Sequence, residues 1–69
     1  MFKDIAENSE HLSIIGGYVI SINKYGTCYA YKLHTDDTLT RVSDCNMQDT
    51  FYNVHGGVNM YRVYEFLVL

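Results

Sequence analysis

The four residues NKYG at positions 23–26 constrain the fold of this chain more than any other stretch of its sequence. Asparagine in the first position and glycine in the fourth favour a type I turn followed by a glycine in the left-handed conformation. The flanking segments 18–22 and 27–33 alternate as paired strands do. The turn then sets the cross-strand pairs, which are Ile22 with Cys28, Ser21 with Tyr29, Ile20 with Ala30, and Val19 with Tyr31. This register predicts an aliphatic face, which we expect to form the core, and a face that carries tyrosines.

Further turn signals divide the remaining chain into short segments. The pair Gly16-Gly17 favours a two-residue type I′ hairpin between segments 12–15 and 18–22, with one strand that contains a glycine bulge as the alternative. The polar residues 34–38 would turn the chain so that 39–42 returns as another strand. Residues 43–50 lack alternation and hold several helix-capping types, which predicts a loop or a single helical turn.

The two ends of the chain favour different elements. Apolar residues at helical spacing predict a short helix within residues 2–11. Residues 58–69 are rich in β-branched and aromatic types, and we predict a long strand there that follows a Gly-Gly turn and a strand over 51–55. An amphipathic helix is the alternative for the last segment, because helical spacing also connects Met60, Val63, Tyr64 and Leu67.

Together these segments predict a single domain over residues 1–69. The predicted fold class is mainly β, with α+β as the alternative: a small antiparallel meander or partly open barrel of about four to six strands with a short N-terminal helix. A chain of 69 residues lies near the size at which one hydrophobic core only just offsets the entropy cost of folding. A disulfide, a metal or a partner chain would each supply the additional stability that such a small core lacks.

The loop His55-Gly56-Gly57 raises the question of a catalytic or phosphate-binding role. An oxyanion loop of the lipase type also needs a Gly-x-Ser-x-Gly nucleophile turn, and the chain contains none. A phosphate loop needs glycines that lead into a helix N-terminus, usually with a lysine after them, and none follows here. We therefore interpret these residues as the tip of a hairpin.

The cysteines and histidines do not form a metal-binding pattern. His11, Cys28, His34, Cys45 and His55 are separated by at least six positions, whereas structural zinc sites usually contain close ligand pairs. We expect no metal and no cofactor. We also expect two reduced thiols, with Cys28 in the core and Cys45 in a loop, and a Cys28–Cys45 disulfide is the alternative.

Charge and hydropathy limit the class of partner. Five basic against eight acidic residues give a net charge of −3, which disfavours general binding to nucleic acid. No apolar run approaches the about 20 residues of a membrane-spanning helix, and the N-terminus lacks the pattern of a secretion signal. We therefore expect a cytoplasmic protein with no membrane contact.

No set of residues indicates catalysis. Asp36 and Asp37 are adjacent, so they would point to opposite faces of a strand or into solvent in a turn. A chain of this size also leaves little room for a deep pocket. We expect a protein that is not an enzyme and has no catalytic residues.

The seven tyrosines are the feature most typical of a binding function. Tyrosine combines a large apolar ring with a polar tip and loses little rotamer entropy, and it is enriched at protein interfaces. The alternative is that these rings only fill the core. The predicted partner-binding residues are Tyr29, Tyr31, Tyr61, Arg62, Asp36 and Asp37. The predicted strand over 58–69 has apolar residues on both faces, which favours a homodimer through Tyr64, Phe66 and Val68.

These observations favour a non-enzymatic protein-binding module. A short acidic chain of this kind suits a phage or plasmid accessory protein that inhibits by covering a surface of a host enzyme or defence complex in the host cytoplasm. The alternative is a small barrel that binds single-stranded nucleic acid by stacking bases on its tyrosines. That alternative needs a basic groove, which the charge of the chain disfavours.

Overall fold

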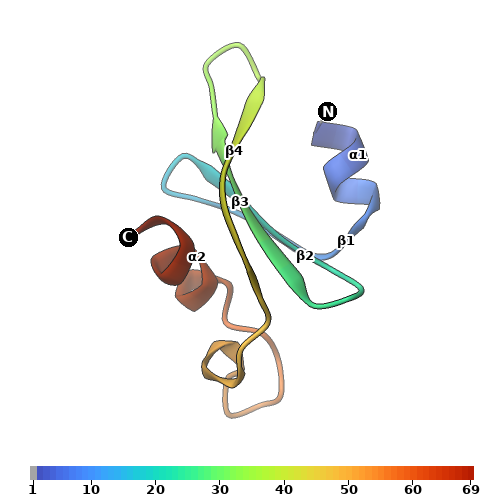
Figure 1. Cartoon of the computed structure of the whole chain (residues 1–69), viewed down its shortest axis with the longest axis vertical. Coiled ribbons are helices and arrows are strands. Elements are labelled where there is room, and N and C mark those ends of the chain that lie inside the picture. The colour runs from blue at the N-terminus through green and yellow to red at the C-terminus, as the bar shows by residue number, and fades with distance from the viewer. Residues whose placement is uncertain (1) are drawn as a thin grey trace.

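The computed structural model describes residues 2–69 (Figure 1). The elements in chain order are α1 (Phe2–Glu7), β1 (Ser9–Ile15), β2 (Tyr18–Asn23), β3 (Thr27–Leu33), β4 (Leu39–Asn46), the 3-10 helix η1 (Asp49–Phe51) and α2 (Met60–Val68). Within these residues the four strands form an antiparallel sheet in the order β1-β2-β3-β4, so each strand pairs with its neighbour in the sequence. The prediction of a small, mainly β meander with a short N-terminal helix is confirmed.

The turn between β2 and β3 has the predicted geometry. The Asn23 side-chain Oδ1 accepts hydrogen bonds from the backbone N–H groups of Tyr25 and Thr27, both at 3.0 Å, and Gly26 has a φ of +83°. All four predicted pairs across this turn are present. The register is correct because the side chain that shapes the turn lies next to the strands that it connects.

The β1–β2 turn is also confirmed. Gly16 and Gly17 have φ values of +56° and +81°, as a type I′ turn requires at both central residues, so the alternative of one bulged strand is wrong. Gly16 has a second role, because a Cβ atom placed on it would lie 2.6 Å from the Tyr64 hydroxyl oxygen of α2. This turn is therefore a surface against which α2 packs.

Two boundaries differ from the prediction. Strand β4 continues to Asn46, so residues 43–46 are strand and not loop, and Cys45 lies in the sheet. The helical turn expected further along is η1. The predicted strand over 51–55 is reduced to a single bridge between Tyr52 and Val58, so a regular hairpin there is wrong. Strand β4 is longer because Ser43 and Cys45 pair with residues of β3, a contact that local alternation does not reveal.

The largest correction concerns the C-terminal segment. Residues 60–68 form α2 and not a strand, which makes the amphipathic-helix alternative correct. The Asn59 side-chain Oδ1 accepts a hydrogen bond from the backbone N–H of Arg62 at 3.2 Å and caps the helix. Only the helix places Met60 and Val63 together against the aliphatic face of the sheet, because residues three positions apart point to opposite faces of a strand. The need to cover that face decides between two patterns that the same residues satisfy.

The main core lies between the sheet and α2. Its buried residues are Ile20, Ile22, Cys28 and Ala30 from the sheet, Phe51 from η1 and Val63 from α2. Figure 1 shows α1 on the other side of the sheet from α2. The face toward α1 has two buried apolar residues of its own, Val19 and Leu39, and the buried Ser21. Each face of the sheet is thus covered by one helix, but the covers differ in size.

Candidate binding surface

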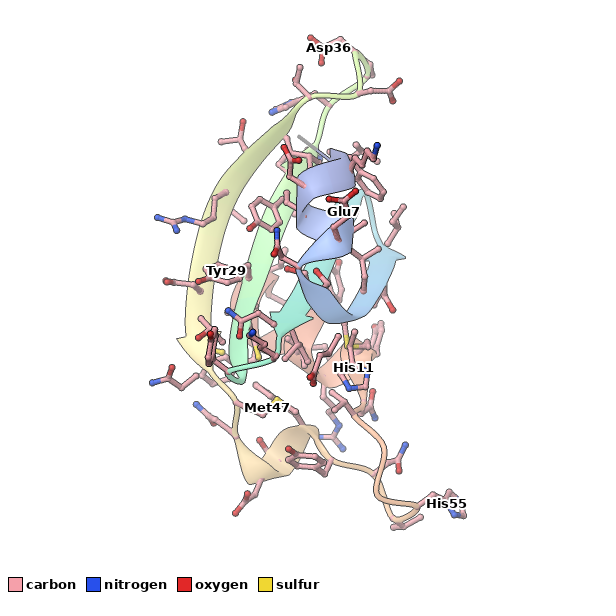
Figure 2. All side chains as sticks on the ribbon, turned by 90° about the vertical axis from the view of Figure 1, so that its right-hand side faces the viewer. Glu7, His11, Tyr29, Asp36, Met47 and His55 are labelled. Atoms are coloured by element: carbon pink, nitrogen blue, oxygen red, sulfur yellow. The ribbon has the colours of Figure 1, made fainter. Side chains whose placement is uncertain are left out.

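A groove lies between α1 and the face of the sheet that carries Tyr29 and Tyr31, which we call the tyrosine groove. Its volume is about 370 Å³. Figure 2 views the molecule from this side, with α1 in front of the strands and Tyr29 beside the helix. The residues that line the groove are Asp4, Ile5 and Asn8 with Ser9 near α1, Ser21 and Asn23 on β2, Tyr29 and Tyr31 on β3, and Arg41 on β4.

The two tyrosines lie side by side because they are two positions apart on β3 and therefore share one face. Their ring centroids are 6.1 Å apart. Tyr29 pairs with Asp44 of β4, and a bulge after Ala30 shifts the pairing so that Tyr31 lies opposite Arg41. The Arg41 guanidinium carbon lies 5.9 Å from the centroid of the Tyr29 ring, within the range of a cation–π contact. The bulge thus brings a cation beside the aromatic pair.

The hydroxyl group of Tyr31 is partly buried in the groove and forms a hydrogen bond with Ser21. Burial raises the pKa of the Tyr31 phenol above its ordinary value of 10.0, and the neighbouring Tyr29 raises it further. Arg41 and a hydrogen bond with Ser21 lower that pKa in part. Because the phenol stays protonated at neutral pH, its oxygen can both donate and accept hydrogen bonds. The groove therefore offers apolar rings, hydroxyl groups and a guanidinium within one small area, a set of groups suited to binding.

The other predicted partner-binding residues lie elsewhere. Tyr61 and Arg62 are exposed on α2, and the Tyr61 ring packs on that of Tyr64 at a centroid distance of 5.7 Å. Asp36 and Asp37 form the tip of the β3–β4 turn, which Figure 2 shows at the opposite end of the molecule from His55. The Thr38 hydroxyl donates to Asp36 Oδ1 at 2.6 Å, and this bond lowers the pKa of Asp36. The six predicted residues therefore belong to three separate surfaces.

The three residues predicted for a dimer interface are on α2. Tyr64 packs on the ring of Tyr18 at 6.2 Å, Phe66 meets Phe51 edge-on at 5.6 Å, and Val68 is half-buried. Phe66 is nevertheless 55% exposed. Pairing of two chains through a strand edge at this place is wrong, because the segment is helical. Whether the chain dimerises stays a prediction.

Sequence reasoning missed three parts of the groove. Ser21 was placed opposite Tyr29 by the predicted register, but nothing marked it as a buried polar residue. Arg41 faces the tyrosines only because of the bulge in β4 pairing. The position of α1 over this face has no local signal, since Ile5 could have packed on either side of the sheet.

The His55-Gly56-Gly57 loop is the tip of a turn, but the hairpin predicted around it is reduced to the single Tyr52–Val58 bridge. The Asn53 side-chain Oδ1 accepts hydrogen bonds from the backbone N–H groups of His55 and Gly57, at 2.9 and 3.1 Å. Figure 2 shows His55 at the far end of the molecule, away from the sheet. With these two N–H groups held by Asn53, the loop does not present them to a bound anion.

No His, Cys, Asp or Glu residues within positions 2–69 gather in a group of three that could hold a metal ion. Both cysteines are free thiols, as expected. None of the helices in the described part of the chain is long and apolar enough to cross a membrane. No protein-family model, curated protein or solved structure matches the chain.

Proposed function

We propose that this chain is a non-enzymatic protein-binding module and that the tyrosine groove is its contact surface. The observation that carries the proposal is the combination of Tyr29, Tyr31 and Arg41 on one face. Tyrosine and arginine dominate the residues that contribute most to protein binding, especially beside a pocket that a partner side chain can fill. The rings are held by the sheet, so little side-chain entropy is lost when a partner binds.

The mode of action that fits a small chain is to cover a surface of another protein. We propose that the partner is an enzyme or a defence complex of a host cell whose active surface is occluded. The main support is size, because an interface of about 800 Å² per partner is typical of stable complexes and would occupy a large share of a surface of 4576 Å². The proposed location of this interaction is the host cytoplasm.

The test uses a tagged chain to capture proteins from extracts of the cells in which it occurs. We expect Tyr29→Ala, Tyr31→Ala or Arg41→Ala to reduce recovery of the partner at least about tenfold, in line with the loss of one central contact. Tyr25→Ala is the matched control, because Tyr25 is 80% exposed and lies on the β2–β3 turn, outside the residues that line the groove. Thermal unfolding checks that every variant is folded.

The captured partner also tests which surface of the chain makes the contact and whether binding inhibits the partner. Recovery that survives all three groove variants but fails with Tyr61→Ala or Arg62→Ala would move the contact surface to α2. Adding the purified chain to the partner should lower the activity of that partner, and a stoichiometric complex with full activity would contradict occlusion.

Binding of single-stranded nucleic acid is the second candidate, and one observation favours it. Tyr29 and Tyr31 lie side by side on a central strand, an arrangement on which bases can stack. The carboxylate of Asp44, which pairs with Tyr29, lies where a phosphate backbone would need cations. Binding to oligonucleotides that weakens steeply with salt, and is lost in Tyr29→Ala, would favour this candidate over the protein partner.

A further inference from the structure

Three sulfur atoms meet at the end of the sheet where β4 leaves it. The Cys28 thiol lies 3.8 Å from the Met47 sulfur, and it shares a hydrogen bond with the Cys45 thiol. Cys28 and Cys45 are direct partners across β3 and β4, on the face opposite the tyrosine groove. Figure 2 shows Met47 just beyond the end of β4. We call Cys28, Cys45 and Met47 the sulfur cluster.

The register of the strands makes a disulfide in this cluster unfavourable. The Met47 N–H donates to the Gly26 carbonyl oxygen at 2.6 Å, so this pair of opposed residues is hydrogen-bonded. Cys28 and Cys45 lie two positions further along both strands and have the same pairing type. In such pairs the Cβ atoms are about 5.5 Å apart, whereas a disulfide needs about 3.5–4.5 Å. A bond between the two sulfurs would therefore distort the sheet.

We propose that the sulfur cluster binds one monovalent copper ion, Cu(I). Thiolate and thioether sulfurs are the ligands that select this ion. Three sulfurs placed in a plane around a metal, each at the about 2.3 Å typical of metal–thiolate bonds, lie about 4 Å from one another. The separation of 3.8 Å between Cys28 and Met47 is close to that value. The wide spacing that disfavours a disulfide thus fits a metal between the sulfurs.

Ligand type and number also favour Cu(I) over zinc. When Cu(I) binds, both thiols release their protons to solvent, because the thiolate is the form that ligates a metal. The two thiolates and the Met47 thioether are a set of soft sulfurs. Structural zinc sites almost always hold four ligands, and His, Cys, Asp and Glu provide no group of three within positions 2–69.

The ion has a route into the site. Cys28 is fully buried, but Cys45 and Met47 are partly exposed, and Met47 lines a small pocket of about 150 Å³ on the surface.

The experiment is an anaerobic titration of the reduced protein with Cu(I) against a coloured Cu(I) chelator. We expect the wild-type chain to remove one equivalent of Cu(I) from the chelator. Cys28→Ser and Cys45→Ser should abolish this competition. Met47→Leu should weaken binding at least about tenfold, since it removes a ligand but keeps the volume of the side chain.

Two matched variants control for binding elsewhere. Met60→Leu removes the thioether of a methionine that packs on the core from α2, and His55→Ala removes a ligand type at the turn tip, at the far end of the molecule in Figure 2. Both should bind copper as the wild-type chain does. If Cys28→Ser does not fold, as judged by thermal unfolding, the partly exposed Cys45→Ser provides the same test.

The proposal is overturned by any of three results. The wild-type chain could fail to compete with the chelator, binding could persist in both cysteine variants, or Met47→Leu could bind as tightly as Met60→Leu. Equal affinity for Zn(II) would overturn the choice of a monovalent ion. We expect these variants to capture the protein partner as the wild-type chain does, so the sulfur cluster and the tyrosine groove are tested independently.

Discussion

The two faces of the sheet are covered by helices of different kinds. Helix α2 has nine residues, buries Val63 and is tied to the sheet by a hydrogen bond from the Ser43 hydroxyl to the Leu67 carbonyl oxygen at 2.7 Å. Helix α1 has six residues, none of them buried, and the side chains of Asn8 and Ser9 bond to carbonyl groups only four positions away. The α2 face therefore provides stability, while the short α1 leaves beside it the groove that we propose for binding.

The sharpest test of this comparison uses two neighbouring residues on β2. Ile20 and Val19 are both fully buried, but Ile20 faces α2 and Val19 faces the side of α1. We expect Ile20→Ala to lower the free energy of unfolding by about 3–5 kcal/mol, and Val19→Ala by about 1–2 kcal/mol because its smaller side chain lies under a thinner cover. Urea unfolding measures both. Equal losses would show that the two faces contribute equally to stability.

A second test compares two glycine turns. Gly16 has a positive φ and lies under the Tyr64 hydroxyl, whereas Gly56 has a positive φ but nothing near its missing side chain. We expect Gly16→Ala to cost about 2–3 kcal/mol, the sum of backbone strain and displacement of Tyr64, and Gly56→Ala to cost about 1 kcal/mol from strain alone. Thermal unfolding measures the difference. If the costs were the same, the packing of α2 on the β1–β2 turn would have no energetic role.

A third test removes the cap of α2. The Asn59 side chain satisfies one of the free N–H groups at the start of the helix, so Asn59→Ala should cost about 1 kcal/mol. Asn59→Asp is the matched control, because aspartate also accepts this bond, and it should unfold close to the wild-type value. A loss for both variants would indicate that the asparagine acts through some contact other than the cap.

The smallest expected effect is the pH dependence of the Cys28 thiol on the α2 face. Its ordinary pKa of 9.0 applies in the unfolded chain, and burial raises it to about 12 in the folded protein. The contribution to stability is complete below pH 9 and is lost as the pH rises toward 12, because only the unfolded chain then releases the proton. At about pH 9.5 the loss should be about 0.8 kcal/mol relative to neutral pH.

The measurement compares this pH dependence in the wild-type chain and in Cys28→Ala, so that the contributions of all other groups cancel. Identical curves would show that the thiol is not desolvated in the folded protein.

The parts of the fold that were predicted correctly depend on residues close together in the chain. The β2–β3 register was predicted pair by pair, because Asn23 and Gly26 determine the turn and alternation determines the faces. The end of β4 and the face of the sheet on which Arg41 lies were not predicted. Both depend on pairing with β3 and on a bulge in that pairing. The same is true of the sulfur cluster, which exists only because β4 extends far enough to place Cys45 opposite Cys28.

By itself, the sequence determined the turns, the alternation of β2 and β3, and the separation of an aliphatic face from a tyrosine face. The tertiary structure alone decided that residues 60–68 are helical, which side of the sheet α1 covers, and which polar and sulfur-bearing side chains meet. The physical reason is the distance along the chain over which each choice is made. Turns and strand faces follow from neighbouring residues, whereas the C-terminal residues satisfy both a strand and a helix pattern, and only the uncovered apolar surface of the sheet selects the helix.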